Sequence, residues 1–243
     1  MKTILALFAC LAFTIPQAQA KEKPKKERLT YNVKIMNANA AEATIITKNS
    51  RHRGKNVKKV YGTLKSKPRW KKIRSVENSA VSVIGKDRYP RRTEISLNNH
   101  TSGKKYVHTI NYSGRTIHGT KTYVHKKKFK TYVVPTKAHT HDVISWVPYL
   151  RHVNYRVGER FQFEMFSGNR LYSAHCKTIG TADLLTDIGI VTAYKVSVQI
   201  FRGGRLYQKA TLWVSADSRR IPLMFSMNTK YGRTSVEITQ IAH

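Results

Sequence analysis

The sequence contains little cysteine. It has two cysteines, and Cys10 lies in an N-terminal segment with the features of a signal peptide, so we expect only Cys176 in the mature chain. A single thiol cannot form an internal disulfide, so side-chain packing must hold the core together. His175 and Cys176 are adjacent, and adjacent strand residues point to opposite faces, which argues against a nucleophilic pair. We therefore expect Cys176 to be a small buried residue on a strand.

Acidic residues are also scarce. The chain has 13 Asp and Glu against 45 Lys and Arg, which gives a formal net charge of +32. Residues 21–134 hold 30 basic and 6 acidic residues, whereas residues 135–243 hold 14 and 7. Such a field attracts polyanions, including anionic lipid, lipopolysaccharide and acidic glycans. A basic envelope proteome can also carry such charge as a general surface property, because solvated charge runs need no specific partner.

The densest groups of basic residues are the candidates for anion binding. They are Lys58, Lys59, Arg69, Lys71, Lys72, Lys126, Lys127 and Lys128. Tyrosines and a tryptophan lie among them, as in binders of single-stranded nucleic acid. Paired strands need aromatic residues in any case, and export removes a protein from most nucleic acid. We therefore expect an anionic lipid or envelope polymer as partner, rather than nucleic acid.

Long apolar runs are confined to the N-terminus. Residues 4–15 are apolar and are followed by Ala18-Gln19-Ala20, which is typical of a signal peptide over residues 1–20. A lipoprotein site at Cys10 would leave a very short apolar core. Residues 21–28 are polar and charged, which predicts a flexible basic leader. No later run is long enough to span a bilayer, so we expect an exported, soluble or peripheral protein, in the periplasm of a Gram-negative bacterium.

Catalytic motifs are missing. The sequence has no G-x-S-x-G, no H-E-x-x-H and no paired C-x-x-C. Its few carboxylates are too scattered to suggest the acid pair of a glycosidase. The Gly203-Gly204 pair is not a phosphate loop, because no helix is predicted after it. The sequence therefore gives no support for an enzyme and implies no cofactor.

Helical periodicity is nearly absent, and short segments of alternating apolar and polar residues fill the chain. The expected strands are residues 29–35, 40–47, 57–64, 79–84, 93–97, 105–112, 121–125, 129–134, 159–166, 170–178, 192–201, 206–214, 221–228 and 234–241. For residues 48–72 a mobile basic loop is the alternative to the strand at 57–64. Residues 142–152 are the one plausible helical segment, kept short by Pro148, and residues 181–188 could add one turn. We predict a single all-β domain over residues 29–243, with a curved antiparallel sheet or open β-barrel.

Residues 139–158 concentrate the side chains that could bind a ligand. His139 and His141 have the H-x-H spacing that places both rings on one face of a strand, where they could bind a metal with His152. A polar loop before a turn is the alternative reading. Trp146, Tyr149 and Arg151 could either cap one end of the sheet or form the rim of a ligand pocket.

Several motifs in the later half resemble a known family. They are D-V-I-S-W-V-P-Y-L-R at residues 142–151, V-G-E-R-F-Q-F at 157–163, A-Y-K-V-S-V at 193–198, L-W-V-S-A-D-S-R-R-I-P-L at 212–223 and Y-G-R-T-S-V-E-I at 231–238. Together with L-T-Y-N-V at residues 29–33, they resemble the bacterial envelope proteins described as domain of unknown function 3108. The resemblance covers most of the mature chain except its Lys/Arg-rich middle.

The resemblance implies an exported protein with a curved antiparallel sheet or open barrel, and it supplies no catalytic residues. Envelope carriers that hold lipid in a half-barrel are comparable at the level of fold alone. Three hypotheses follow. The first is a non-enzymatic envelope protein that binds anionic components through its basic surface, with a hydrophobic cavity as an extension. The alternatives are a metal protein or metal-dependent enzyme centred on His139 and His141, and a structural module for protein–protein interaction.

Overall fold

The alternating segments form strands, because a period of two places every second side chain on the same face. The structure is a computed structural model that describes residues 26–71, 75–137 and 139–243. The earlier strands are β1 (Lys26–Ile35), β2 (Ala38–His52), β3 (Lys55–Ser66), β4 (Val76–Ile84), β5 (Pro90–Asn99), β6 (Lys104–Ser113), β7 (Thr116–Tyr123) and β8 (Lys128–Pro135). The later strands are β9 (Thr140–His141), β10 (Arg160–Ser167), β11 (Arg170–Thr186), β12 (Gly189–Arg202), β13 (Arg205–Ser215), β14 (Pro222–Thr229) and β15 (Gly232–Ala242).

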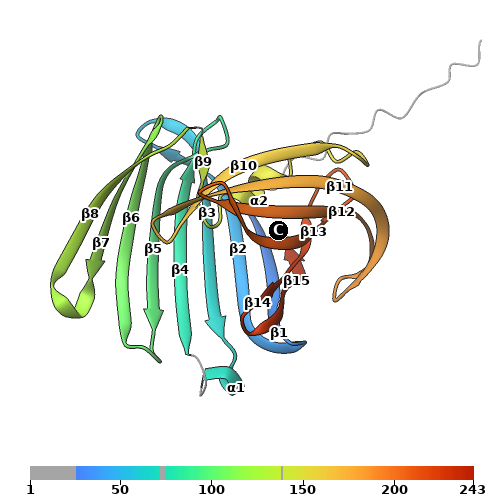
Figure 1. Cartoon of the computed structure of the whole chain (residues 1–243), viewed down its shortest axis with the longest axis horizontal. Helices are drawn as coiled ribbons and strands as arrows, with labels where there is room; N and C mark the ends of the chain where they lie inside the picture. Colours follow the sequence, from blue (N-terminus) through green and yellow to red (C-terminus); the bar gives the residue numbers. More distant parts are fainter. Residues whose placement is uncertain (1–25, 72–74, 138) are drawn as a thin grey trace, which may run out of the picture.

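These strands form one 15-stranded sheet whose order is β8-β7-β6-β5-β4-β3-β2-β1-β15-β14-β13-β12-β11-β10-β9. Neighbouring strands are antiparallel except β9 and β10, which run parallel. The first and last strands, β1 and β15, pair with each other and join the two halves of the sheet. In Figure 1, β2 to β8 stand side by side as a curved wall, and β10 to β13 cross beside it. The all-β prediction is confirmed.

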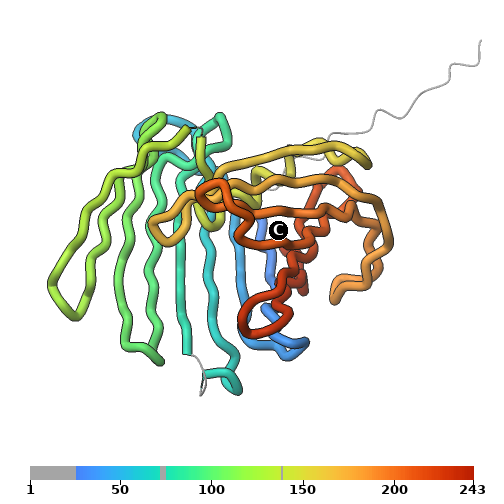
Figure 2. Tube along the Cα trace, in the orientation of Figure 1, coloured from blue at the N-terminus to red at the C-terminus, as the bar shows by residue number. Residues whose placement is uncertain are grey.

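The sheet curls without closing. Its two edges are β8 and β9, which follow each other in the chain. The five steps from Pro135 to Thr140 span at most about 18 Å, so these two ends must lie close together. The trace in Figure 2 shows the resulting open, curled shape. The predicted open barrel with an antiparallel sheet is therefore correct, with the β9–β10 pair as its one parallel contact among the described strands.

Helical structure is limited to short pieces in the described residues. They are α1 (Pro68–Lys71), the 3-10 turn η1 (Val124–Lys126) and α2 (Trp146–Leu150). The last confirms the helical segment expected near residues 142–152. The helical turn considered for residues 181–188 is wrong, because β11 continues to Thr186 and pairs with β12 as far as Gly189. Pairing with a long neighbour outweighs the weak local preference of such a segment.

Strand boundaries also differ from the predictions. β1 begins at Lys26, so residues 26–28 of the predicted leader belong to the sheet, and Glu27 is buried. The strand predicted at residues 121–125 lies earlier, at Thr116–Tyr123, and is followed by η1. The predicted signal peptide, residues 21–25 and Lys72 lie outside the described residues. The alternation identified the strands better than it identified their ends.

The core is divided into clusters by the curl of the sheet. One cluster beneath α2 contains Leu150, Tyr155 and Cys176, while His175 beside Cys176 is exposed. Burial raises the pKa of the Cys176 thiol to about 12. Cys176 is therefore the inert core residue that the sequence predicted. A second cluster joins the two halves, because Phe166 at the end of β10 packs with Ile110 and Ile117 of β6 and β7.

Tyr132 on the edge strand β8 lies across Gly119 of β7. A Cβ atom at Gly119 would lie 2.0 Å from Cζ of Tyr132. The Tyr132 hydroxyl bonds to Nε2 of His108 on β6, and its ring packs near Phe166 at 6.0 Å between centroids. An aromatic ring laid over a strand glycine covers the backbone that the glycine leaves bare. Because Gly119 has no side chain, Tyr132 of the edge strand β8 can reach across β7 and bond to His108 of β6.

We expect Gly119→Ala to destabilise the fold by about 2 kcal/mol, because the added methyl group displaces the Tyr132 ring and breaks its bond to His108. Chemical denaturation measures this loss. The matched control is Gly180→Ala on β11, where a Cβ atom meets nothing within 4 Å. Equal stability of the two variants would show that Tyr132 does not need the space above Gly119.

Candidate functional site

Asp142 anchors the segment that carries the predicted site. Its side chain is completely buried. Oδ2 accepts hydrogen bonds from Ser82 Oγ of β4 and Thr93 Oγ1 of β5, both at 2.5 Å. Oδ1 accepts from the backbone N–H groups of Ile144 and Ser145, both at 2.8 Å. The carboxylate therefore fastens residues 142–145 to the inner face of the sheet.

The same residue begins the helical segment. Ser145 Oγ accepts a hydrogen bond from the Asp142 N–H at 2.9 Å, which completes a reciprocal cap with the bond from the Ser145 N–H to Asp142. This arrangement satisfies donors that the start of a helix leaves free. α2 follows at once, and Pro148 lies in its first turn, where a missing N–H is tolerated. Asp142 thus stabilises the turn of residues 143–145 that leads into α2, and it also bonds to the sheet.

Two of the three predicted rim residues hold α2 in place. The indole N–H of Trp146 donates to the Val143 carbonyl at 3.0 Å, and its ring lies 6.1 Å from that of Phe225. Arg151 pairs with the buried Glu27 of β1, and its Nε donates to the Arg219 carbonyl at 2.7 Å. Both side chains thus bond or pack within the protein. This is what we expected if the segment caps one end of the sheet rather than forming the rim of a ligand pocket.

The three histidines of the metal hypothesis lie in different surroundings. His141 is buried in an aromatic cluster, with ring centroids 4.8 Å from Tyr89 and 4.5 Å from Tyr149. Burial lowers its pKa to about 4. His139 is exposed and stacks on Tyr89 at 4.7 Å, while the exposed His152 lines a cavity. In residues 26–71, 75–137 and 139–243 no group of three or more His, Cys, Asp and Glu is placed to hold a metal.

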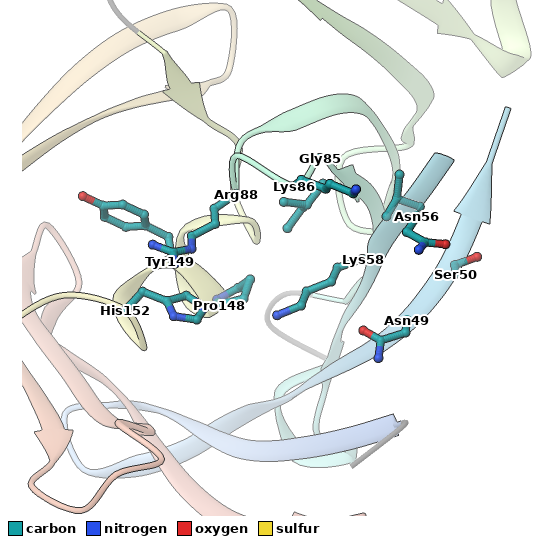
Figure 3. A pocket seen from close by; sticks show the side chains of 12 residues that line it. Asn49, Ser50, Asn56, Lys58, Gly85, Lys86, Arg88, Pro148, Tyr149 and His152 are labelled. Atoms are coloured by element: carbon teal, nitrogen blue, oxygen red, sulfur yellow. The ribbon is translucent and has the colours of Figure 1, made fainter. Parts of the chain in front are cut away.

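A cavity of about 560 Å³ opens beside α2. Its walls come from the β2–β3 hairpin, the end of β4 with the β4–β5 turn, and α2 together with His152. The lining residues are Asn49, Ser50, Asn56, Val57, Lys58, Ile84, Gly85, Lys86, Arg88, Pro148, Tyr149 and His152. Figure 3 shows side chains from these walls arranged around the open space. Its volume lies in the range of small-molecule sites.

The cavity is positively charged. Its lining contains Lys58, Lys86 and Arg88, and no carboxylate of residues 26–71, 75–137 or 139–243 belongs to it. Asp87, in the same turn as Lys86, pairs with Arg91 at 2.7 Å and does not line the space. Arg88 has a φ of +72°, a left-handed conformation that costs a side-chain-bearing residue roughly 1–2 kcal/mol. The tight β4–β5 turn therefore holds a strained arginine at the cavity wall.

The predicted anion-binding residues are divided by the fold. Lys58 lines the cavity, and Lys59 follows it on β3 and points to the opposite face. Arg69 and Lys71 belong to α1, beyond the far end of β3 and about 26 Å or more from Lys58 by strand rise. Lys126, Lys127 and Lys128 form the connection from β7 to β8. One member of the set thus belongs to this cavity.

Lys86 and Arg88 were not among the predicted anion-binding residues. The sequence Gly85-Lys86-Asp87 favours a turn, but nothing in the local sequence indicates that this turn lies near α2. Tyr149 is the one predicted rim residue that lines the cavity. Trp146 and Arg151 do not line it.

The comparisons agree with this architecture. Residues 30–239 match the model of a family described as protein of unknown function DUF3108. The chain belongs to this family. The resemblance drawn from the sequence motifs is therefore confirmed, and the match also covers the Lys/Arg-rich middle, which the motifs had left out. No curated protein matches the DUF3108 chain.

The chain is also similar to solved structures, and the first of them shows the fold. A beta-barrel-like protein of domain of unknown function DUF1849 from Brucella abortus has a TM-score of 0.55 at 7% identity, and the match covers 89% of the DUF3108 chain and 96% of that chain. A protein with a YmcC-like fold from Bacteroides fragilis has a TM-score of 0.39 at 9% identity, covering 89% and 95%. In the described part of the DUF3108 chain, no helix is long and apolar enough to cross a membrane.

Proposed function

We propose that this DUF3108 protein is an exported protein of the bacterial envelope that binds anionic components, namely lipid headgroups, lipopolysaccharide or another polyanion. It acts by binding and not by catalysis, and it associates with the membrane surface peripherally. The positively charged cavity beside α2 carries the proposal, because three cations and no carboxylate line a ligand-sized space. A positive cleft raises the local concentration of anions and accelerates their association.

The overall charge supports the same function. The net charge of +32 is concentrated in residues 21–134, which supply most of the wall that Figure 1 shows as β2 to β8. Salt bridges within the sheet neutralise some of the acidic residues, as in the Lys34–Glu237 and Lys65–Glu77 pairs. Most of the basic side chains therefore have no carboxylate to pair with, since the chain has 45 of them against 13 acids.

Vesicle co-sedimentation tests the proposal with the chain from residue 21 onward. We expect binding to vesicles that contain phosphatidylglycerol, and not to vesicles of phosphatidylcholine alone. Binding should weaken strongly with added salt, because the Debye length falls from about 10 Å at 0.1 M to about 3 Å at 1 M. Equal sedimentation with both vesicle types at both salt concentrations would refute an electrostatic interaction. Lipopolysaccharide added as a competitor tests the second class of polyanion.

A further inference from the structure

We propose that the cavity beside α2 is a phosphate site, and that it takes a phosphate group carried on a hydroxylated headgroup such as glycerol or a sugar. This inference rests on the proposed function and deepens it, because it names one site and one ligand class. Lys58, Lys86 and Arg88 surround the phosphate. The remaining polar wall contacts the hydroxyl groups.

The cations suit a phosphate in number and kind. They reach the cavity from two elements, with Lys58 on β3 and Lys86 and Arg88 on the β4–β5 turn. Figure 3 shows the Lys58 side chain extending into the space between the turn and α2. Arginine offers a planar fork that binds two phosphate oxygens, and lysine supplies a compact charge with three donors. Three cations therefore lie in the lining, and none of the described residues that line the cavity is a carboxylate.

Part of the remaining wall can bind hydroxyl groups, and part of it is apolar. Asn49, Ser50 and Asn56 contribute amide and hydroxyl groups that both donate and accept hydrogen bonds. An acyl chain would bury these groups without partners, which is costly. Pro148 and Tyr149 supply an apolar surface for the carbon face of a glycerol or sugar unit.

The strained backbone at Arg88 supports a binding role. Among the lining residues it is the one non-glycine residue with a positive φ, at +72°. A glycine would adopt this conformation without strain. Strained residues persist where the surrounding structure holds them, and they cluster at ligand sites. An arginine at this position places its guanidinium in the cavity on the side of Tyr149 of α2, as Figure 3 shows.

Three variants test the site. Lys58→Gln and Arg88→Gly each remove one cavity cation, and Lys59→Gln removes the next cation along β3 on the opposite face. Arg88→Gly also relieves the strained φ, so its melting temperature should equal or exceed that of the wild type. Loss of binding in a variant that melts no lower cannot come from unfolding. Thermal melting of all three variants accompanies every binding measurement.

Isothermal titration calorimetry with glycerol 3-phosphate is the first arm, and glycerol is the probe without phosphate. We expect the wild type to bind glycerol 3-phosphate and not glycerol. Lys58→Gln and Arg88→Gly should each weaken binding about 10-fold or more, because each removes a charge-assisted contact. Lys59→Gln should change the affinity by less than about 2-fold, since its side chain faces away from the cavity.

Vesicles containing phosphatidylglycerol are the second arm, and they separate a lipid headgroup from a soluble phosphorylated ligand. Binding in both arms, lost in the two cavity variants, supports the phosphate site with a lipid source. Binding of glycerol 3-phosphate without vesicle binding supports the site with a soluble source and overturns the membrane part of the proposed function. Vesicle binding that survives in both cavity variants overturns the phosphate site and leaves the proposed function standing. Absence of binding in both arms overturns both proposals.

Discussion

Replacing Asp142 by alanine is expected to lower the free energy of unfolding by about 4 kcal/mol. The substitution leaves the hydroxyls of Ser82 and Thr93 and the N–H groups of Ile144 and Ser145 without their acceptor. Hydrogen bonds to a charged group contribute roughly 1.5–3 kcal/mol each, and buried groups left without a partner add a desolvation cost. This carboxylate is completely buried, so water cannot easily replace it.

Urea denaturation of the wild type and of Asp142→Ala measures the difference in the free energy of unfolding. Asp183→Ala on β11 is the matched control, because Asp183 is an exposed aspartate that accepts one bond, from Thr192 Oγ1 at 2.7 Å. We expect the control to lose less than about 1 kcal/mol. A loss in Asp142→Ala no larger than in Asp183→Ala would mean that the buried carboxylate does not anchor the segment. Because α2 forms one wall of the cavity, Asp142→Ala should also weaken glycerol 3-phosphate binding.

Acid is expected to destabilise the protein between about pH 6.5 and pH 4. Burial lowers the pKa of His141 from 6.5 to about 4, and burial together with the nearby charge of Lys121 lowers that of His108 to about 4. In this window the unfolded chain binds a proton at each histidine and the folded chain does not, so stability falls with the pH. At pH 4 the loss is about 3 kcal/mol for the deeply buried His141 and smaller for His108, where solvent screening reduces the contribution.

The surroundings of both rings explain this direction. His141 lies among Tyr89, Tyr149 and Phe163, with Ser145 Oγ 3.3 Å from its Nδ1, so no carboxylate bonds to its charged form. His108 bonds to the hydroxyl of Tyr132. Asp217 and Glu237 have lowered pKa values because hydrogen bonds to neighbouring side chains outweigh their burial. Their contributions are therefore lost at lower pH, below the window of the histidines.

Thermal melting as a function of pH separates these contributions. His141→Phe places an apolar ring in an aromatic cluster, and His108→Gln keeps a polar group near Tyr132. Each variant should reduce the fall in stability between pH 6.5 and pH 4, and the double variant should remove most of it. An unchanged fall in the double variant would show that other groups bind the protons.

The sequence by itself determined the fold class and the faces of the strands. The alternation in residues 159–166 and 192–201 predicted β10 and β12 closely, because a half-buried strand needs this pattern whatever its partners are. It also separated the buried Cys176 from the exposed His175, since adjacent side chains point apart. The family motifs around Asp142 identified the segment on which the fold depends.

Tertiary structure alone decided what these faces meet. Asp142 bonds to Ser82 and Thr93, which lie 60 and 49 residues earlier. Lys58 reaches the same cavity as Arg88, while its neighbour Lys59 does not. A period of two fixes on which side of a sheet a residue lies, but not how the sheet curls or which strands become neighbours. The cavity forms where the β2–β3 hairpin, the β4–β5 turn and α2 meet. These segments are far apart in the sequence, and only the packing of the whole chain brings them together.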